Sequence, residues 1–158
     1  MYRSYDKSMS VIEDVKTILG KTPSPQTKIK ESPKTILIVE DDTILLEMYK
    51  DKFIKEGFAV LTAGNGKEGL EKTIEQKPNI ILLDLMMPVM NGEMMLRKLR
   101  EFPQFKRLPI IVLTNAGEVD NIRQTKRYDN ACDFLIKSNV SIEDVVQKVK
   151  FWLPAFLT

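Results

Sequence analysis

Acidic side chains follow two of the apolar runs in this chain, and their type and spacing suit phosphate chemistry. Glu40, Asp41 and Asp42 come directly after one run, and Asp84 comes directly after another. Carboxylates that converge in this way repel one another unless a cation lies between them. A hard divalent ion with oxygen ligands, such as Mg²⁺, relieves that repulsion and also binds phosphate oxygens. A carboxylate can itself act as a nucleophile and form an acyl phosphate.

Two further polar residues complete the pattern at the ends of later apolar runs. Thr114 follows one of these runs and Lys137 follows the next. In phosphoryl transfer, positioning and charge neutralisation do most of the catalysis, because negative charge spreads over the phosphoryl oxygens. A lysine supplies positive charge to those oxygens, and a threonine hydroxyl donates a hydrogen bond to them. Each residue taken alone has an ordinary structural role, and Asp42 has the type and position of a helix N-cap. Together they indicate a phosphoryl site.

The elements that must position these residues alternate along the chain. The apolar runs are short, rich in Ile, Val and Leu and mostly continuous, as expected for strands of a parallel sheet covered on both faces. Segments with helical periodicity, capping residues and stop signals lie between them. The expected strands are Thr35–Val39, Phe58–Ala63, Ile80–Leu83, Pro109–Leu113 and Cys132–Ile136. The expected helices are Asp42–Glu56, Gly66–Gln76, Asn91–Arg100, Asp120–Tyr128 and Ser141–Trp152.

This alternation predicts an α/β fold. Strands each followed by a helix make a doubly wound, flavodoxin-like parallel sheet of the (βα)5 type, with strand order 2-1-3-4-5. In that order the switch point lies between strands 1 and 3, and ligands bind there at the carboxyl ends of the strands. Glu40, Asp41 and Asp84 are therefore expected to meet at one edge of the sheet. A (β/α)8 barrel needs many more residues than 158.

The composition excludes several classes of protein. The chain has no histidine, which removes His-based acid–base catalysis, Ser-His-Asp triads and histidine metal clusters. Cys132 is the only cysteine, so no internal disulfide can form, and a reducing cytoplasm is the expected location. No membrane span or signal peptide is expected. The net charge is +2, and the excess of cations lies in the first 34 residues, so the main domain is not expected to bind nucleic acid.

The first part of the chain differs from the rest. Residues 1–33 are expected to form an N-terminal extension, and residues 34–158 the main domain. Within the extension, Ser10–Leu19 has the apolar spacing of a short amphipathic helix. The segment from Gly20 to Pro33 holds three prolines among Lys, Ser and Thr and is typical of an extended linker.

With these residues in these positions, the sequence resembles the receiver domain of bacterial two-component response regulators. The resemblance covers Pro33 to Leu153 and rests on three segments and one single residue. These are Ile38-Val39-Glu40-Asp41-Asp42, Asp84-Leu85-Met86-Met87-Pro88-Val89-Met90-Asn91-Gly92, Thr114 and Asp133-Phe134-Leu135-Ile136-Lys137. The Asp-x-x-Met-Pro-x-Met-Asn-Gly segment is highly specific. Proline stiffens the turn after the nucleophile, and Asn-Gly begins the next helix.

The resemblance implies a role for each matching residue. Asp84 becomes the phosphoacceptor, and Lys137 the cation beside it. Mg²⁺ (or Mn²⁺) would be held by a set comprising Glu40, Asp41, Asp84 and the backbone carbonyl of Met86. Thr114 becomes the switch hydroxyl that moves toward the phosphoryl group, and Phe134 the switch aromatic that swings inward with it. Read without the family, Phe134 is equally well an ordinary core aromatic.

The resemblance also implies partners. A sensor histidine kinase or a histidine phosphotransfer protein would supply the phosphoryl group, and the chain would be a stand-alone phosphoacceptor, not a turnover enzyme. No DNA-binding domain is expected, so output would run through protein contacts of helix 4, strand 5 and helix 5, about Asp120 to Trp152. A homodimer is compatible with this reading. In the first helix, Leu45, Met48, Tyr49 and Phe53 are the expected core stripe. Leu46 and Ile54 beyond it offer either a docking face for the phosphodonor or a broader buried stripe.

The sequence departs from the family pattern at a few places. Ser138 follows the lysine where the family usually has proline, so the loop that presents Lys137 is expected to differ in shape. Met86 and Ala116 occupy two positions that influence the access of the hydrolytic water in the family. Neither side chain can orient water, and we therefore expect a long-lived phosphoryl group.

Three alternatives belong to other classes of protein. A phosphatase with an aspartate nucleophile would have an acid where Met86 stands. A flavodoxin-like flavin carrier would have a Ser/Thr/Gly-rich phosphate loop where Glu40, Asp41 and Asp42 stand. The third is a binding module that keeps the receiver fold and signals without phosphorylation, for which Ser138 leaves room.

Overall fold

A computed structural model describes residues 32–115 and 132–153 of the chain. The expected helices at 10–19 and 120–128, and residue Ala116, lie outside these ranges. So does nearly all of the expected N-terminal extension, and the division of the chain at residue 33 stays a prediction.

Five parallel strands form one sheet with the order β2-β1-β3-β4-β5. This confirms the doubly wound, flavodoxin-like fold. The strands are β1 (Thr35–Val39), β2 (Ala59–Ala63), β3 (Ile80–Asp84), β4 (Ile110–Thr114) and β5 (Cys132–Ile136). β1 pairs with both β2 and β3, and the register places Val39 opposite Leu83. The order reverses at β1, so the polar residues that follow β1 lie beside those that end β3.

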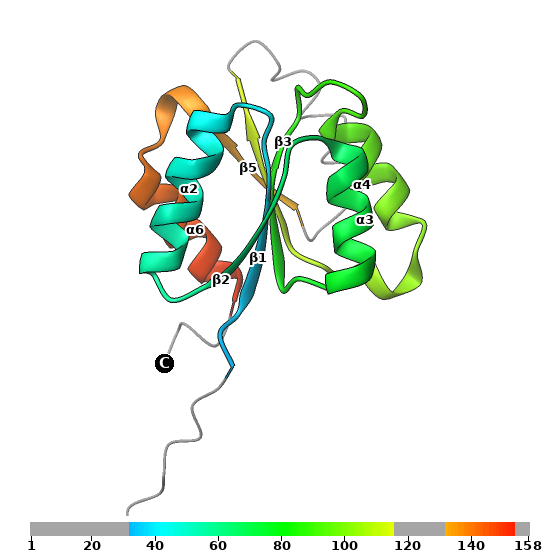
Figure 1. Cartoon of the computed structure of the whole chain (residues 1–158), viewed down its shortest axis with the longest axis horizontal. Helices are drawn as coiled ribbons and strands as arrows, with labels where there is room; N and C mark the ends of the chain where they lie inside the picture. Colours follow the sequence, from blue (N-terminus) through cyan, green and yellow to red (C-terminus); the bar gives the residue numbers. More distant parts are fainter. Residues whose placement is uncertain (1–31, 116–131, 154–158) are drawn as a thin grey trace, which may run out of the picture. The chain divides into compact units, whose positions relative to one another are not determined.

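Helices cover the two faces of this sheet. Figure 1 shows α2 and α6 on one side and α3 and α4 on the other. Their bounds are α2 (Thr43–Lys55), α3 (Gly66–Gln76), α4 (Gly92–Arg100) and α6 (Ile142–Trp152), with short 3₁₀ turns η1 (Pro103–Phe105) and η3 (Lys137–Asn139). Side-chain caps fix where these helices begin. Asp42, Asn65 and Asn91 accept backbone N–H groups at the first turns of α2, α3 and α4, and Ser141 with Asp144 forms a capping box at α6.

Each face of the sheet has its own apolar core. Alternate strand residues such as Ile36 and Ile38 pack with Phe53 of α2 and Val145 of α6. The intervening residues such as Leu37 and Val39 pack in a second cluster with the apolar side of α4. β3 and β4 are buried along their whole length, which explains why their sequences do not alternate.

The buried stripe of α2 is partly different from the expected one. Met48 is 43% exposed and does not belong to the core. Leu46 instead packs against the core beside Leu45, with Tyr49 and Phe53 buried. Because α2 turns by 3.6 residues, a stripe that includes Leu45, Leu46, Tyr49 and Phe53 is directed away from Met48. Ile54 is 52% exposed, as expected for a residue beyond the core stripe.

Candidate functional site

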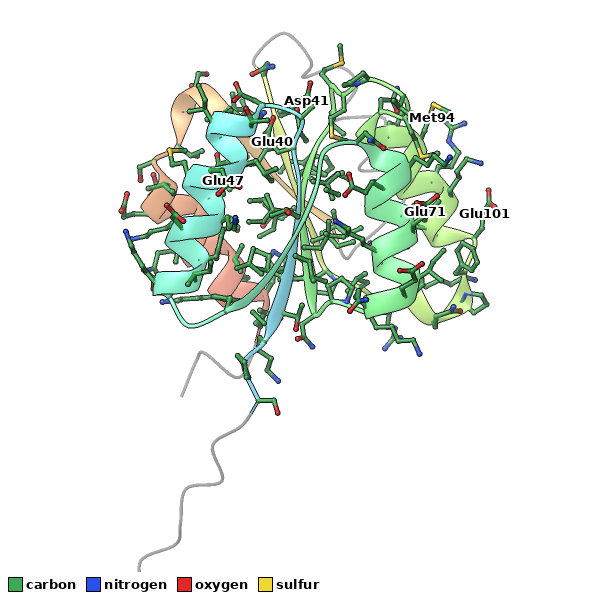
Figure 2. The ribbon with its side chains drawn as sticks, viewed as in Figure 1. Glu40, Asp41, Glu47, Glu71, Met94 and Glu101 are labelled. Carbon is green, nitrogen blue, oxygen red and sulfur yellow. The ribbon has the colours of Figure 1, made fainter. Side chains whose placement is uncertain are left out.

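The candidate site lies at the carboxyl ends of β1 and β3. β3 extends one residue further than expected, so that Asp84 is its last residue. Glu40 and Asp41 follow β1, and Figure 2 shows both at the end of that strand. The Glu40 amide donates to the Ala63 carbonyl on the neighbouring β2, which continues the strand pairing up to the first acid. Strand pairing therefore fixes the backbone of Glu40 at the end of β1.

Three carboxylates converge at this edge. Oxygens of Glu40, Asp41 and Asp84 all lie within 4.8 Å of one another. Glu40 and Asp84 are buried, whereas Asp41 is exposed. This donor set consists of oxygen atoms only, which fits a hard divalent cation such as Mg²⁺. The exposed Asp41 leaves one side open to water and to a phosphoryl oxygen, and Mg²⁺ sites in proteins commonly keep such positions open.

Lys137 enters this cluster from the end of β5. Its Nζ lies 2.7 Å from Glu40 Oε2 and 3.4 Å from Asp84 Oδ1. The lysine side chain is 15% exposed, and burial alone would lower its pKa. The hydrogen bond to Glu40 and the charges of Asp84 and Glu40 outweigh that effect and raise the pKa of Lys137 above its usual value. The ammonium group therefore stays charged between the two buried acids.

The environment of Asp84 opposes its ionisation. Burial and the nearby Glu40 charge raise the pKa of the Asp84 carboxyl to about 6. Lys137 and the Met86 amide, which donates to Asp84 Oδ1 at 3.4 Å, partly offset this. At neutral pH the folded protein therefore holds an ionised carboxylate in a place that disfavours charge.

The loop from Leu85 to Asn91 is held by backbone contacts around Asp84. Gly92 donates its amide to the Leu85 carbonyl at 2.9 Å, and a β-carbon at Gly92 would overlap the Asp84 carbonyl oxygen. Gly66 at the start of α3 donates to the Met90 carbonyl at 2.9 Å. Gly92 is therefore required by close approach of the backbone, whereas sequence reasoning gave it only a place at the start of the next helix.

Exposed apolar residues lie in this loop. Met86 is 58% exposed and Val89 is 80% exposed. Val89 also has a φ of 70°, in the left-handed region that β-branched residues rarely adopt. The side chain of Met86 thus faces solvent next to the acid cluster, where it offers no polar atom to a water molecule.

Thr114 and Phe134 lie where the sequence placed them, on β4 and β5. Thr114 is fully buried as the last residue of β4, and its hydroxyl donates to the Asn115 carbonyl at 3.4 Å. Phe134 is partly buried and packs against the core cluster on the α3–α4 side of the sheet. The switch roles of both residues stay predictions.

A short 3₁₀ turn follows β5 at Lys137. Lys137, Ser138 and Asn139 form the 3₁₀ turn η3, and the described residues contain no cis peptide bond. The Ser138 hydroxyl donates to Asn139 Oδ1 at 3.0 Å within this turn. A serine therefore follows Lys137 without disturbing its ion pairs.

One buried residue near the site was assigned only to the core by sequence reasoning. Tyr49 of α2 is 6% exposed, and burial raises its phenol pKa, while the charges of Lys137, Glu40 and Asp84 also act on that pKa. Tyr49 therefore belongs to the electrostatic environment of the site. Its position in a helix that packs under the acids carries no signal in the sequence, because an aromatic residue on an apolar stripe is the usual core pattern.

A doubly wound sheet with carboxylates and a partly buried lysine at its switch point is typical of α/β proteins that bind a divalent cation and phosphoryl groups at that edge. Residues 36–150 match the family model for the response regulator receiver domain. The chain therefore belongs to the response regulator receiver domains of two-component signalling, which are not turnover enzymes.

Known relatives agree with this assignment. The chain is 26% identical over 124 residues to the polar-differentiation response regulator DivK of Brucella anthropi, covering 77% of this chain and 97% of that protein. It is 37% identical over 115 residues to the transcriptional regulatory protein SrrA of Staphylococcus aureus, covering 73% of this chain but only 46% of SrrA.

Solved structures share the fold. The response regulator TrrA of Thermotoga maritima, crystallised in complex with Mg²⁺–BeF, matches with a TM-score of 0.66 and 26% identity, covering 76% of this chain and 99% of TrrA. The acid cluster described above is typical of the Mg²⁺ site of receivers. In the ranges that the structure describes, we find no helix with the length and apolarity needed to cross a membrane.

Proposed function

We propose that Asp84 accepts a phosphoryl group from the phosphohistidine of a sensor histidine kinase or a histidine phosphotransfer protein. An Asp84 carboxylate oxygen forms the new bond to phosphorus while the bond between phosphorus and the donor's histidine nitrogen breaks. The single observation that carries the proposal is the convergence of Glu40, Asp41 and Asp84 with the Lys137 ammonium at the switch point. Phosphoryl transfer needs a carboxylate nucleophile and concentrated positive charge. This edge of the sheet provides the carboxylate, and Lys137 provides part of the positive charge.

A divalent cation supplies the remaining positive charge. Glu40, Asp41, Asp84 and the Met86 carbonyl would hold Mg²⁺ or Mn²⁺, which when bound neutralises charge on the phosphoryl oxygens. Lys137, held between Glu40 and Asp84, places its ammonium beside the acceptor oxygen. The raised pKa of Asp84, about 6, still leaves it ionised and nucleophilic at neutral pH.

Signalling follows from the change in charge at Asp84. We propose that the Thr114 hydroxyl turns toward the phosphoryl oxygens and that Phe134 turns inward with it, which would alter the face formed by β5 and α6. A downstream protein, or a second copy of the chain, would contact that face. The exposed Ile54 of α2 supports docking of the phosphodonor on this helix. The cytoplasm is the location that fits such a donor, and residues 1–33 would be an extension to the domain.

Mass spectrometry tests the proposal. The purified full chain is treated with acetyl phosphate with and without Mg²⁺, alongside Asp84→Asn. We expect one Mg²⁺-dependent adduct of about 80 Da, the mass of a single phosphoryl group on a carboxylate, and none in the variant. The matched control is Asp51→Asn, which removes an exposed acid of α2 outside the cluster and should leave the adduct unchanged. Absence of the adduct with every phosphodonor would instead favour the phosphorylation-independent binding module.

The same preparation tests the expected lifetime of the phosphoryl group. The exposed Met86 side chain offers no polar atom to a hydrolytic water. We expect slow loss of the adduct after the donor is removed, and faster loss in Met86→Asn, because an amide can orient water. Rapid loss from the unmodified protein would contradict this expectation.

A further inference from the structure

A cavity lies at the edge of the sheet opposite to the acid cluster. Its volume is about 640 Å³, within the range of small-molecule sites in proteins. Two loops form it: the α3–β3 loop contributes Lys77 and Asn79, and the segment between α4 and β4 contributes Gln104, Phe105 and Arg107. Both loops precede strands of the parallel sheet, so they lie at its amino edge, where strand β1 begins in Figure 1.

The polar residues of this cavity are all able to donate hydrogen bonds. Lys77 and Arg107 are cations, and among the described residues neither forms an ion pair. Asn79 and Gln104 contribute side-chain amides, and no acidic residue lines the cavity. The Oδ1 atom of Asn79 accepts the Thr35 amide at 2.7 Å, so the donor end of this side chain is the part left for a ligand.

The apolar part of the cavity is fixed in position. Phe105 is 5% exposed and Leu108 lines the same wall. Arg100 of α4 donates from its guanidinium to the carbonyls of both residues, which holds η1 and the following turn in place. The wall therefore needs little rearrangement on binding, which limits the entropic loss that weakens flexible sites.

Lys77 is held in an unusual backbone conformation. It ends α3 with φ 48° and ψ 63°, the left-handed region in which glycine is the usual residue at a helix C-terminus. Its amide donates to the Thr73 carbonyl at 3.0 Å, which keeps the turn closed. The ammonium group thereby starts from a fixed point at the rim of the cavity.

We propose that this cavity binds a mononucleotide. Lys77 and Arg107 would contact its phosphate, because an ammonium and a guanidinium are the usual phosphate partners in proteins. The amides of Asn79 and Gln104 would donate to acceptor atoms of the base or ribose, beside the apolar wall of Phe105 and Leu108. The site is separate from the Asp84 cluster, and this proposal does not depend on the proposed phosphoacceptor function.

Nuclear magnetic resonance on the full chain tests the proposal. AMP is titrated into ¹⁵N-labelled protein in EDTA, which prevents metal-dependent binding at the acid cluster. We expect saturable shifts of the amide signals of Lys77, Asn79 and Arg107. Affinity should fall by about tenfold or more in Arg107→Gln, because a charge-assisted contact to phosphate is lost. Lys106→Gln is the matched control: this neighbouring cation is exposed but does not line the cavity, and AMP affinity should be retained.

Titrations with adenosine and with inorganic phosphate test which part of AMP the cavity binds. Adenosine and inorganic phosphate should each bind more weakly than AMP. Phosphate that binds as tightly as AMP would overturn the assignment to a nucleotide. The proposal as a whole is overturned by an absence of saturable shifts at these amides, or by equal loss of affinity in Arg107→Gln and Lys106→Gln. Both Arg107→Gln and Lys106→Gln should keep a dispersed spectrum, since both residues are exposed.

Discussion

Asp84 and Lys137 show how burial and charge act against each other at single residues. Lys137 is much closer to Glu40 than to Asp84, at 2.7 Å against 3.4 Å. Glu40 therefore takes the main ion pair, while Asp84 is left with a weaker one and a raised pKa. Burial and the Glu40 charge therefore outweigh the ion pair of Asp84 with Lys137.

This arrangement predicts that Asp84→Asn stabilises the metal-free protein at neutral pH. The pKa of Asp84 is raised from 3.8 to about 6 on folding, so its protonation favours the folded state. That contribution is present below pH 3.8 and is lost as the pH rises through 6. At pH 7.5 the neutral amide should therefore add roughly 1–3 kcal/mol to the free energy of unfolding. Urea unfolding in EDTA measures it.

The pH dependence separates this effect from simple changes in packing. At pH 4.5 the gain from Asp84→Asn should be much smaller, because the native carboxyl is then largely protonated. Asp51→Asn, at an exposed position of α2, should change little at either pH. A variant that is less stable than the unmodified protein at pH 7.5 would contradict the explanation.

A second gain in stability is expected when Val89 is replaced by glycine. A β-branched residue with positive φ costs about 1–2 kcal/mol relative to one in the right-handed regions. Glycine avoids that cost but adds about 0.5–1 kcal/mol of chain entropy to the unfolded state. Val89→Gly should therefore raise the free energy of unfolding by a few tenths to about 1 kcal/mol, as measured by denaturant titration. Val140→Gly is the matched control, because Val140 has φ −127° and should lose stability on the same change.

At the scale of elements, the close packing between β3 and α4 predicts that alanine destabilises the protein more at Gly92 than at Gly64, which follows β2. Gly92→Ala would put a β-carbon against the Asp84 carbonyl and should cost about 2–4 kcal/mol, the range for severe steric conflicts in packed regions. It should also slow phosphorylation by acetyl phosphate, because the loop next to the acceptor must move. Gly64→Ala meets nothing closer than Glu68 Oε2 at 3.8 Å and should be nearly neutral. Thermal unfolding compares the two, and similar losses would contradict the contact.

The strands and the acid cluster could be predicted from sequence because local patterns determine them. Continuous apolar runs indicated buried strands, and the acids at their ends followed from the strand order. Contacts between distant segments could not be predicted from these local patterns. The exposure of Met48 depends on how α2 rolls against the sheet, and the turn η1 depends on Arg100 reaching two carbonyls. The preference of Lys137 for Glu40 also depends on tertiary structure, because the lysine side chain reaches from the end of β5 to the residue that follows β1.

At the scale of the whole molecule, the two edges of the sheet differ in charge. The carboxyl edge holds the acid cluster, and the amino edge holds a cavity lined by Lys77 and Arg107. Ion pairs on one face also connect distant parts of the chain: Lys52 contacts Glu143, and Lys150 contacts Glu56 at 2.6 Å. These pairs join α2 to α6, which are far apart in the sequence but lie on the same side of the sheet.

The acid cluster predicts that Mg²⁺ stabilises the whole domain. A cation that binds the folded chain alone, at about 100 times its dissociation constant, adds about 2.7 kcal/mol to the free energy of unfolding. Thermal melts at increasing Mg²⁺ against EDTA measure the effect. Asp41→Asn should reduce it without unfolding the protein, since Asp41 is exposed. Equal stabilisation of the unmodified protein and Asp41→Asn would point to non-specific ion effects instead.

Trp152, the only tryptophan of the chain, lies at the end of α6 and donates its indole N–H to Asp133 Oδ2 on β5 at 3.2 Å. Burial alone would raise the pKa of Asp133, but hydrogen bonds from Lys148, the Phe134 amide and Trp152 hold it below its usual value, so its carboxylate remains charged beside the indole. The emission of an indole responds to such a neighbouring charge. The chain therefore carries an intrinsic optical probe that is hydrogen-bonded to the strand of Phe134. Events at Asp84 that reach this strand can be timed by stopped-flow fluorescence without any label.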